Sequence, residues 1–557
     1  MLSRNLSRRD FLRLAGLGLA GSYLSACAPE APASAAAWLI TETSPTAPAN
    51  PTASATSQPS LTALKVEAIL PATSTPAPTQ APPTQAPSPS PTLAPGATLR
   101  PATDVLTQAQ KKRLASAALR YIAADEVKAI QVARSLGYLD HDGHPASVCG
   151  PLAAAILRDA GLLSQYVDLH EFWLLNPRTG QSVLERNFPR DAFIWYQTSQ
   201  STADYDFGAF PLKAGDFVYL YAGDPGSFEH MLIVSRLDEQ GRPYAVTNIN
   251  TPQGYVIQET LLYDPARPGV GQFYDWTDRK KNGRLGLTGF GGFLLIRFQT
   301  PVIDPGPQEI ALAQAVDGIV EKYGGDWRIY IKEIGGPVVY ARRERYTLHP
   351  ASVIKVPIAM LFFKSLEQAG VIDYTPELKK GVDGRSYQQL LKAMLVNSEE
   401  KAATSLEQDI LTRRLDEFSV LESWGAPHTY IAIRQSTAYE MAILFEGLFS
   451  GRCVEAAPRQ MILDYLAVYS SGDNTRLGVI RKHLPDGYPF YNKRGTITAG
   501  LLVVADTAIV KLPTRHGDKL YVIAAFAYQG KNATTYNRLE TALGILANQL
   551  WQYTQDL

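Results

Sequence analysis

The amino-acid sequence predicts two α+β domains that follow a long segment unable to form a core. Three observations support this prediction. The chain has 557 residues, which is more than one domain with a single compact core usually contains. Residues 28–103 consist mainly of Pro, Thr, Ser and Ala, whereas the remainder contains two successive series of helical and strand patterns. A Pro-rich joint at residues 300–307 separates the two series.

The first 27 residues have the features of an export signal. The stretch SRRDFLR at residues 7–13 has the form of a twin-arginine signal, and the apolar run that follows is too short for a permanent membrane span. The tetrapeptide LSAC, which ends at Cys27, resembles a bacterial lipobox and implies lipidation of Cys27. A plain cleaved signal with an unrelated cysteine is the alternative. We expect export by the twin-arginine route and a lipid anchor at the cell envelope, outside the cytoplasm.

Residues 28–104 are predicted to be a disordered linker. Stretches such as TSTPAPTQAPPTQAPSPSPT cannot bury a core and favour extended, partly polyproline-type conformations. Such a tether would hold folded domains away from the membrane surface.

Charge and composition exclude several functional classes. Lys+Arg and Asp+Glu are equal at 53 each, so nothing favours binding to nucleic acid. The 8 His are scattered and no Cys-x-x-Cys occurs, so we expect no metal and no cofactor. Of the 3 Cys, Cys27 is assigned to the lipid, which leaves Cys149 and Cys453 without a disulfide framework.

The first domain is predicted over residues 105–300. Helical patterns come first, including a helix over residues 147–163. Four strand patterns follow, separated by Gly, Pro and Asp turns: DFVYLYAG, HMLIVSRL, PYAVTNI and GGFLLIRF. Helices followed by antiparallel strands indicate an α+β fold.

A candidate nucleophile in this domain is Cys149. It precedes an apolar helical run with Pro151 in the first turn, and a helix N-terminus stabilises a thiolate. His230 opens one predicted strand and Asn248 ends the next, which is the residue set for thiolate–imidazolium catalysis. Asn250 is the alternative orienting amide. A structural, buried Cys149 is the competing interpretation.

These motifs resemble papain-like bacterial cysteine peptidases of the bacteriocin-leader-peptidase-like or cell-wall amidohydrolase type. The resemblance implies a papain-like α+β domain with Cys149, His230 and Asn248 as catalytic residues. One feature departs from the pattern: no Gln stands just before Cys149 to supply the oxyanion donor. His144 or the backbone amide of Cys149 is left for that role.

The second domain is predicted over residues 308–557. A helix (ALAQAVDGIVEKYG) and two strands (WRIYIKEI, PVVYARRE) precede a block of helices over residues 351–466. Two strands (AGLLVVADTAIVKLP, DKLYVIAAFAYQ) and a terminal helix end the chain. The two ends of the domain therefore enclose an all-helical insertion.

Three short motifs of this domain carry chemistry. Ser352 and Lys355 are three residues apart at the start of an apolar helix, so the amine reaches the hydroxyl, and a desolvated Lys can act as a base. Ser398 lies in the stretch VNSEEKAA. Lys493 opens the stretch KRGT, directly before the last pair of strands.

In this order and spacing the motifs resemble class A β-lactamases and penicillin-binding-type serine hydrolases. The resemblance implies a β-lactamase-like α/β sandwich with an all-helical subdomain. It further implies Ser352 as the nucleophile and Lys355 as the base. Ser398 would be the proton relay, and Lys493 would be the cation that faces a substrate carboxylate. Backbone amides of Ser352 and Thr496 would form the oxyanion hole, with Gly495 and Glu400 in the substrate-binding set.

The departures from this pattern concern turnover. Glu400 stands where the family has an amide that contacts substrate, and Arg494 replaces a Thr. No Glu occurs between Trp424 and Ser436, where class A enzymes carry the residue that activates the deacylating water. We therefore expect little β-lactamase activity.

The sequence as a whole predicts an exported, lipid-anchored hydrolase that acts on peptide or amide bonds of peptidoglycan. The alternative is a non-catalytic envelope-binding or scaffold protein in which one or both sites are degenerate. Glu400 and Arg494 motivate this alternative for the second domain, and the missing Gln motivates it for the first.

Overall fold

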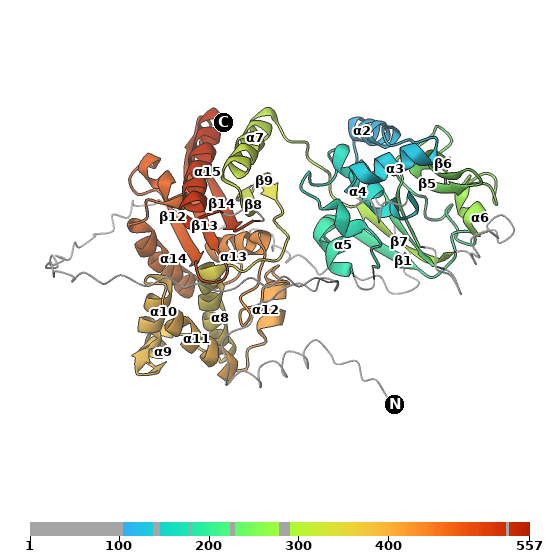
Figure 1. The fold of residues 1–557 in the computed structure, drawn as a ribbon. Coiled ribbons are helices and arrows are strands. Elements are labelled where there is room, and N and C mark those ends of the chain that lie inside the picture. The colour runs from blue at the N-terminus through green and yellow to red at the C-terminus, as the bar shows by residue number, and fades with distance from the viewer. Residues whose placement is uncertain (1–103, 138–144, 178–179, 223–228, 278–289, 531–533) are drawn as a thin grey trace, which may run out of the picture. The chain divides into compact units, whose positions relative to one another are not determined.

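The computed structural model describes residues 104–137, 145–177, 180–222, 229–277, 290–530 and 534–557 (Figure 1). The predicted export signal, the lipidation site Cys27, nearly all of the linker and His144 lie outside the described residues. No helix in the described ranges is long and apolar enough to cross a membrane.

The first segment, residues 104–300, contains helices followed by antiparallel strands. Its helices are α2 (Gln108–Leu119), α3 (Glu126–Ser135), η1 (Pro145–Ser147), α4 (Cys149–Asp159), η2 (Leu169–Phe172), α5 (Gln181–Asn187) and α6 (Gln272–Thr277). Its strands are β1 (Phe193–Thr198), β2 (Phe217–Ala222), β3 (His230–Ile233), β4 (Arg236–Leu237), β5 (Pro243–Thr251), β6 (Gly254–Leu261) and β7 (Phe290–Phe298). The order β1-β7-β2-β3 forms one sheet and β4-β5-β6 another. The four predicted strands are confirmed as β2, β3, β5 and β7; β1 and β6 were not predicted.

The sheet that contains β2 and β3 is buried on both faces. Side chains alternate along a strand, so each face receives every second residue. Tyr219 and Met231 belong to the apolar cluster that includes α4. Leu220 and Leu232 belong to a separate cluster that includes Trp276 of α6. Neighbouring residues of β3 therefore lie in two different cores.

The second segment, residues 307–557, has a five-stranded antiparallel sheet, a two-stranded antiparallel sheet (β10-β11) and many helices. Its helices are α7 (Pro307–Tyr323), η3 (Ala351–Ile354), α8 (Lys355–Gln368), α9 (Tyr374–Lys379), α10 (Tyr387–Leu395), α11 (Glu400–Thr412), α12 (Glu417–Ser423), α13 (Ala438–Ser450), α14 (Ala456–Ser471), η4 (Arg476–His483) and α15 (Tyr536–Asp556). Its strands are β8 (Asp326–Glu333), β9 (Val338–Arg342), β10 (Gly381–Val382), β11 (Arg385–Ser386), β12 (Phe490–Ile497), β13 (Val503–Thr514) and β14 (Gly517–Tyr528).

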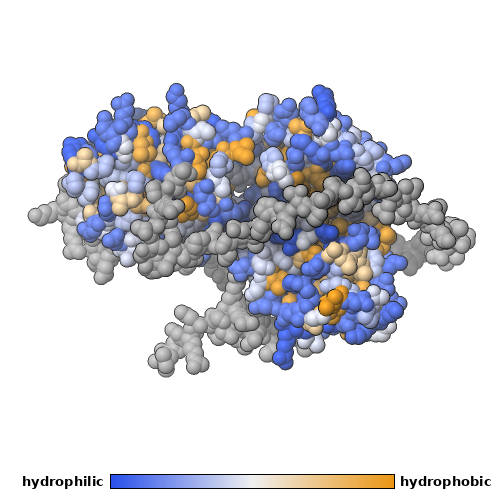
Figure 2. Space-filling model, turned by 180° about the vertical axis from the view of Figure 1, so that it is seen from behind, coloured by the Kyte–Doolittle hydropathy of each residue, from blue (hydrophilic) through white to orange (hydrophobic). Residues whose placement is uncertain are grey.

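The five-stranded sheet has the order β12-β13-β14-β8-β9 and separates two apolar cores. One core contains side chains of α7 and α15, and the other contains side chains of α13 and the helical block (Figure 1). Strands from both ends of the segment thus enclose the helices α8 to α14, as predicted. Hydrophilic residues cover most of the face shown in Figure 2, with hydrophobic residues interspersed.

Candidate active site at Ser352

Ser352 lies where the edge of the sheet meets the helical block. It belongs to η3, which leads directly into α8 and packs against the edge strand β12. Ala351, directly before it, has a φ of 48°, a left-handed conformation that is costly for a residue with a Cβ. Such strain before a half-buried serine is typical of a backbone shaped for a function.

Gly495 of β12 permits the close approach of the sheet to the Ser352 backbone. A Cβ at residue 495 would lie 2.8 Å from the Ala351 Cβ, 2.8 Å from the Pro350 carbonyl oxygen and 3.1 Å from the Ser352 nitrogen. Only a glycine therefore allows β12 to pass so near the Ser352 backbone. Thr496, the next residue, is exposed, and its Oγ1 accepts a hydrogen bond from Arg476 at 2.7 Å. The oxyanion role of the Thr496 amide stays a prediction.

The amine of Lys355 is buried and contacts three oxygen atoms. Only 1% of the residue is exposed. Its Nζ donates hydrogen bonds to Ser352 Oγ at 3.0 Å and to the Ser398 carbonyl oxygen at 2.6 Å, and lies 2.8 Å from Glu400 Oε2. An ammonium group has three protons, so each of the three oxygens matches one donor.

Ser398 connects Lys355 to the second predicted lysine. Lys493 Nζ donates to Ser398 Oγ at 2.9 Å, while the carbonyl of Ser398 accepts from Lys355. Ser398 has a φ of 57°, another left-handed conformation at this site. Burial, together with the nearby charges of Lys355 and Arg494, lowers the pKa of Lys493 to about 7. The structure thus brings Ser352, Lys355, Ser398 and Lys493 into one chain of contacts.

A buried polar network behind β12 was not predicted. Asn492 donates through Nδ2 to Asp473 at 2.7 Å and to Asp506 at 3.0 Å. Arg476 donates through Nη1 to the carbonyls of Gly495 and Ala505, each at 2.8 Å. Burial raises the pKa of Asp506 to about 7. The signal in the sequence was an Asp inside the apolar strand VVADTAIV, since such a carboxylate needs buried partners.

Glu400 begins α11, and its carboxylate is paired with Lys355 and Arg434. Its Oε1 accepts from Arg434 Nη2 at 2.9 Å, and Arg434 Nη1 lies 2.5 Å from Glu407. Burial acts to raise the pKa of Glu400, but the hydrogen bonds from Lys355 and Arg434 outweigh it and leave the pKa below its usual value. The predicted contact of Glu400 with substrate stays a prediction. The contact with Lys355 is an observation.

The Cys149 and His230 side chains lie on opposite faces of the sheet, so the predicted catalytic pair is not formed. Cys149 belongs to the core that contains Met231, and the Met231 side chain lies against Gly150 of α4. His230 pairs across the strands with Leu220 on the other face. There its Nε2 lies 2.7 Å from Thr247 Oγ1 and its ring lies 4.7 Å from that of Trp276.

The pKa values of Cys149 and His230 agree with this separation of the two side chains. Burial raises the pKa of the Cys149 thiol and lowers the pKa of His230 to about 3, so the neutral form of each is favoured at neutral pH. Asn248, in contrast, lies on the side of Cys149, where its Nδ2 donates to the Ala146 carbonyl at 3.1 Å. It thereby holds η1, the turn before α4, rather than the imidazole.

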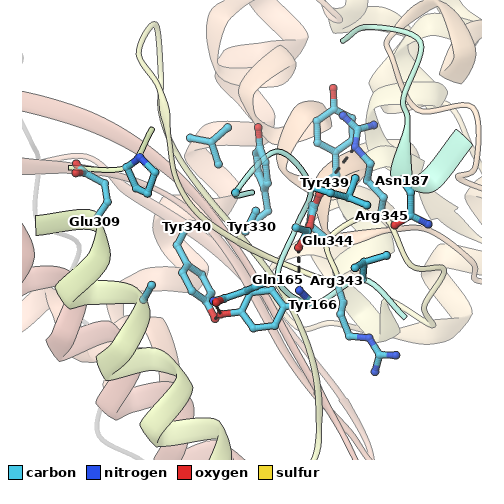
Figure 3. A pocket seen from close by; sticks show the side chains of 18 of the residues that line it. Gln165, Tyr166, Asn187, Glu309, Tyr330, Tyr340, Arg343, Glu344, Arg345 and Tyr439 are labelled. Atoms are coloured by element: carbon cyan, nitrogen blue, oxygen red, sulfur yellow. Dashed lines mark hydrogen bonds and ion pairs between the residues drawn. The ribbon is translucent and has the colours of Figure 1, made fainter. Parts of the chain in front are cut away.

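A separate cavity of about 680 Å³ contains none of the predicted site residues. Figure 3 shows Tyr166, Tyr340, Glu344 and Tyr439 among the side chains that line it. Among the lining groups, Tyr166 Oη lies 3.1 Å from Tyr340 Oη, and Arg345 Nε lies 3.9 Å from Glu344 Oε1.

Comparisons with known proteins concern the second segment. Residues 311–554 match the family model described as Beta-lactamase2, the beta-lactamase enzyme family. No curated protein is similar enough in sequence to count as a relative.

Several solved structures are similar to part of the chain. A beta-lactamase from Desulfarculus baarsii DSM 2075 is 19% identical, with 44% of this chain and 98% of that chain covered and a TM-score of 0.36. A point mutant of PBP-A, an acyl-enzyme complex with penicillin-G, is 18% identical, with coverages of 46% and 100% and a TM-score of 0.36. A class A beta-lactamase representative from Bacteroides cellulosilyticus DSM 14838 is 14% identical, with coverages of 46% and 100% and a TM-score of 0.37.

Proposed function

We propose that residues 311–554, which match the Beta-lactamase2 family model, form a β-lactamase-like serine hydrolase domain with Ser352 as its nucleophile, and that the protein is an exported acyl-transfer enzyme of the cell envelope. The observation that carries the proposal is the 3.0 Å hydrogen bond between Lys355 Nζ and Ser352 Oγ. A hydroxyl that contacts a buried amine is one arrangement that activates a serine as a nucleophile.

In the proposed reaction, Ser352 Oγ attacks an acyl carbon while its proton passes to the neutral amine of Lys355. Backbone amides of Ser352 and Thr496 stabilise the oxyanion that forms. The bond to the leaving group then breaks, and the leaving group takes a proton from Ser398 Oγ. Lys493 Nζ, which lies 2.9 Å from Ser398 Oγ, returns a proton to that hydroxyl. Water later cleaves the acyl–serine ester and regenerates Ser352.

The proposed substrates are peptides of peptidoglycan. The family match supports acyl-transfer chemistry, and the N-terminal signal motifs favour a location where peptidoglycan is the abundant substrate. β-Lactam hydrolysis should be slow, because no Glu between Trp424 and Ser436 is present to activate the deacylating water. The lipid on Cys27 would hold the enzyme at the membrane. Replacing Cys27 with Ala should release the protein into the soluble fraction of the envelope.

The first segment is proposed to bind rather than to cleave. The cysteine amidase that the sequence predicted would need the imidazole of His230 beside the thiol of Cys149, and the two lie in different cores. The non-catalytic alternative is therefore favoured for this segment alone.

Labelling with a fluorescent penicillin tests the proposal. We expect covalent labelling of the full chain, complete loss of label in Ser352→Ala, and unchanged labelling in Cys149→Ala. Equal labelling of the wild type and Ser352→Ala would contradict the assignment of the nucleophile. Loss of label in a folded Cys149→Ala variant would contradict the division of roles between the segments.

A further inference from the structure

The contacts of Lys355 raise a question about its role as a base. An amine accepts a proton only when it is neutral, but this amine has three oxygen neighbours, one for each proton of an ammonium. Two of these oxygens are uncharged, those of Ser352 and of the Ser398 carbonyl. The third belongs to the Glu400 carboxylate, which is the neighbour able to take a proton from the amine.

We propose that Glu400 is the proton acceptor for Lys355 and thereby a further catalytic residue of the acylation step. This inference rests on the proposed function of Ser352. One N–H bond of the Lys355 ammonium breaks and one O–H bond forms on Glu400 Oε2 across 2.8 Å, leaving a neutral amine and a neutral carboxylic acid. Because the pKa of Glu400 is lowered, this transfer is uphill, and the neutral pair exists only transiently during the attack of Ser352. The amine then takes the Ser352 proton as Oγ attacks the acyl carbon, and the acid later returns its proton to solvent.

The two carboxylate oxygens of Glu400 have different partners, so one can be held in place while the other receives the proton. Oε1 accepts from Arg434, whereas Oε2 lies on Lys355. Arg434 is itself held by Glu407 and has a φ of 53°, so the guanidinium that orients Glu400 is fixed by its own partners. The Glu400 side chain is 63% exposed, so solvent can receive the proton afterwards.

The loop opposite this site offers no other carboxylate for the task. The residues from Trp424 to Ser436 contain neither Asp nor Glu, and this stretch contributes Arg434 instead. The neighbouring Glu399 is directed elsewhere, since its Oε1 lies 2.9 Å from Arg385 Nη1. Glu399 therefore provides a matched control: it is the adjacent carboxylate on the same turn, paired with another cation.

The experiment measures the rate of acylation of the full chain by a fluorescent penicillin. Glu400→Gln keeps the shape of the side chain but cannot take the proton, so we expect acylation to slow by about 100-fold. Glu399→Gln should acylate at the wild-type rate. In Glu400→Ala, added formate should restore much of the lost rate, because a diffusible carboxylate replaces the missing acceptor.

Each outcome decides between roles for Glu400. A Glu400→Gln variant that acylates as fast as the wild type, or faster, would overturn the proposal; the faster rate would indicate that Glu400 blocks the site. Slow acylation of Glu400→Ala that formate does not improve would assign Glu400 a positioning role only and would also overturn it. A wild type that takes no label would instead overturn the proposed function of Ser352.

Discussion

Lys493 Nζ lies 2.9 Å from Ser398 Oγ, although the two residues are 95 positions apart in the chain. Ser398 in turn contacts Lys355, so two lysines from different elements meet around one serine. Burial is the main cause that lowers the pKa of Lys493 to about 7, and the nearby charge of Lys355 lowers it further. The charge at this position should therefore change within the physiological pH range.

The first prediction concerns pH. The pKa of Lys493 is lowered, so its cation is present below about pH 7 and is lost as the pH rises through that value. If Lys493 binds a substrate carboxylate, the KM for carboxylate-bearing substrates should rise severalfold between about pH 6 and about pH 8. In Lys493→Arg the cation persists, so this rise in KM should disappear. A KM that rises equally in both proteins would contradict the assignment.

The second prediction concerns the approach of β12 to the nucleophile. In Gly495→Ala the new methyl group would meet backbone and Cβ atoms at 2.8 Å, so β12 must move away from Ser352. We expect acylation to slow by about 100-fold, since a displacement of about 1 Å at a catalytic group can reduce the rate by that factor. Gly318→Ala is the matched control. It has nothing within 4 Å of the added methyl and lies in α7, where Ala should stabilise the helix by about 0.5–1 kcal/mol.

The third prediction concerns the thiol. Cys149 is 7% exposed and burial raises its pKa, so the folded protein should react with iodoacetamide at residue 149 much more slowly than the unfolded chain does. Peptide mass spectrometry after timed alkylation measures this rate. Rapid alkylation of Cys149 that is abolished in His230→Ala would restore the catalytic pair that the structure separates.

The sequence was sufficient for the order of most elements, although β1 and β6 were missed, and for the contact between Lys355 and Ser352. Ser352 and Lys355 lie within one helical entry, so local spacing determines their contact. The face of His230 was not predictable in the same way. All four residues of β3 are buried, so alternation of polar and apolar residues gave no signal for which of them face α4.

The position of Glu400 also lay beyond sequence reasoning. Its contact with Lys355 depends on how the start of α11 meets the start of α8, two helices separated by 31 residues of chain. The motif indicated a departure from the family pattern but not the partner of the carboxylate. The buried partners of Asp506 depend in the same way on tertiary packing.

The most direct test of the account is to locate the covalent adduct after reaction with penicillin, by mass spectrometry of the digested full chain. We predict an acyl adduct on the peptide that contains Ser352. In Lys355→Met the hydroxyl loses its proton acceptor, so this adduct should form about 100-fold more slowly than in the wild type. An adduct on another residue, or equal rates in the wild type and Lys355→Met, would contradict activation of Ser352 by Lys355.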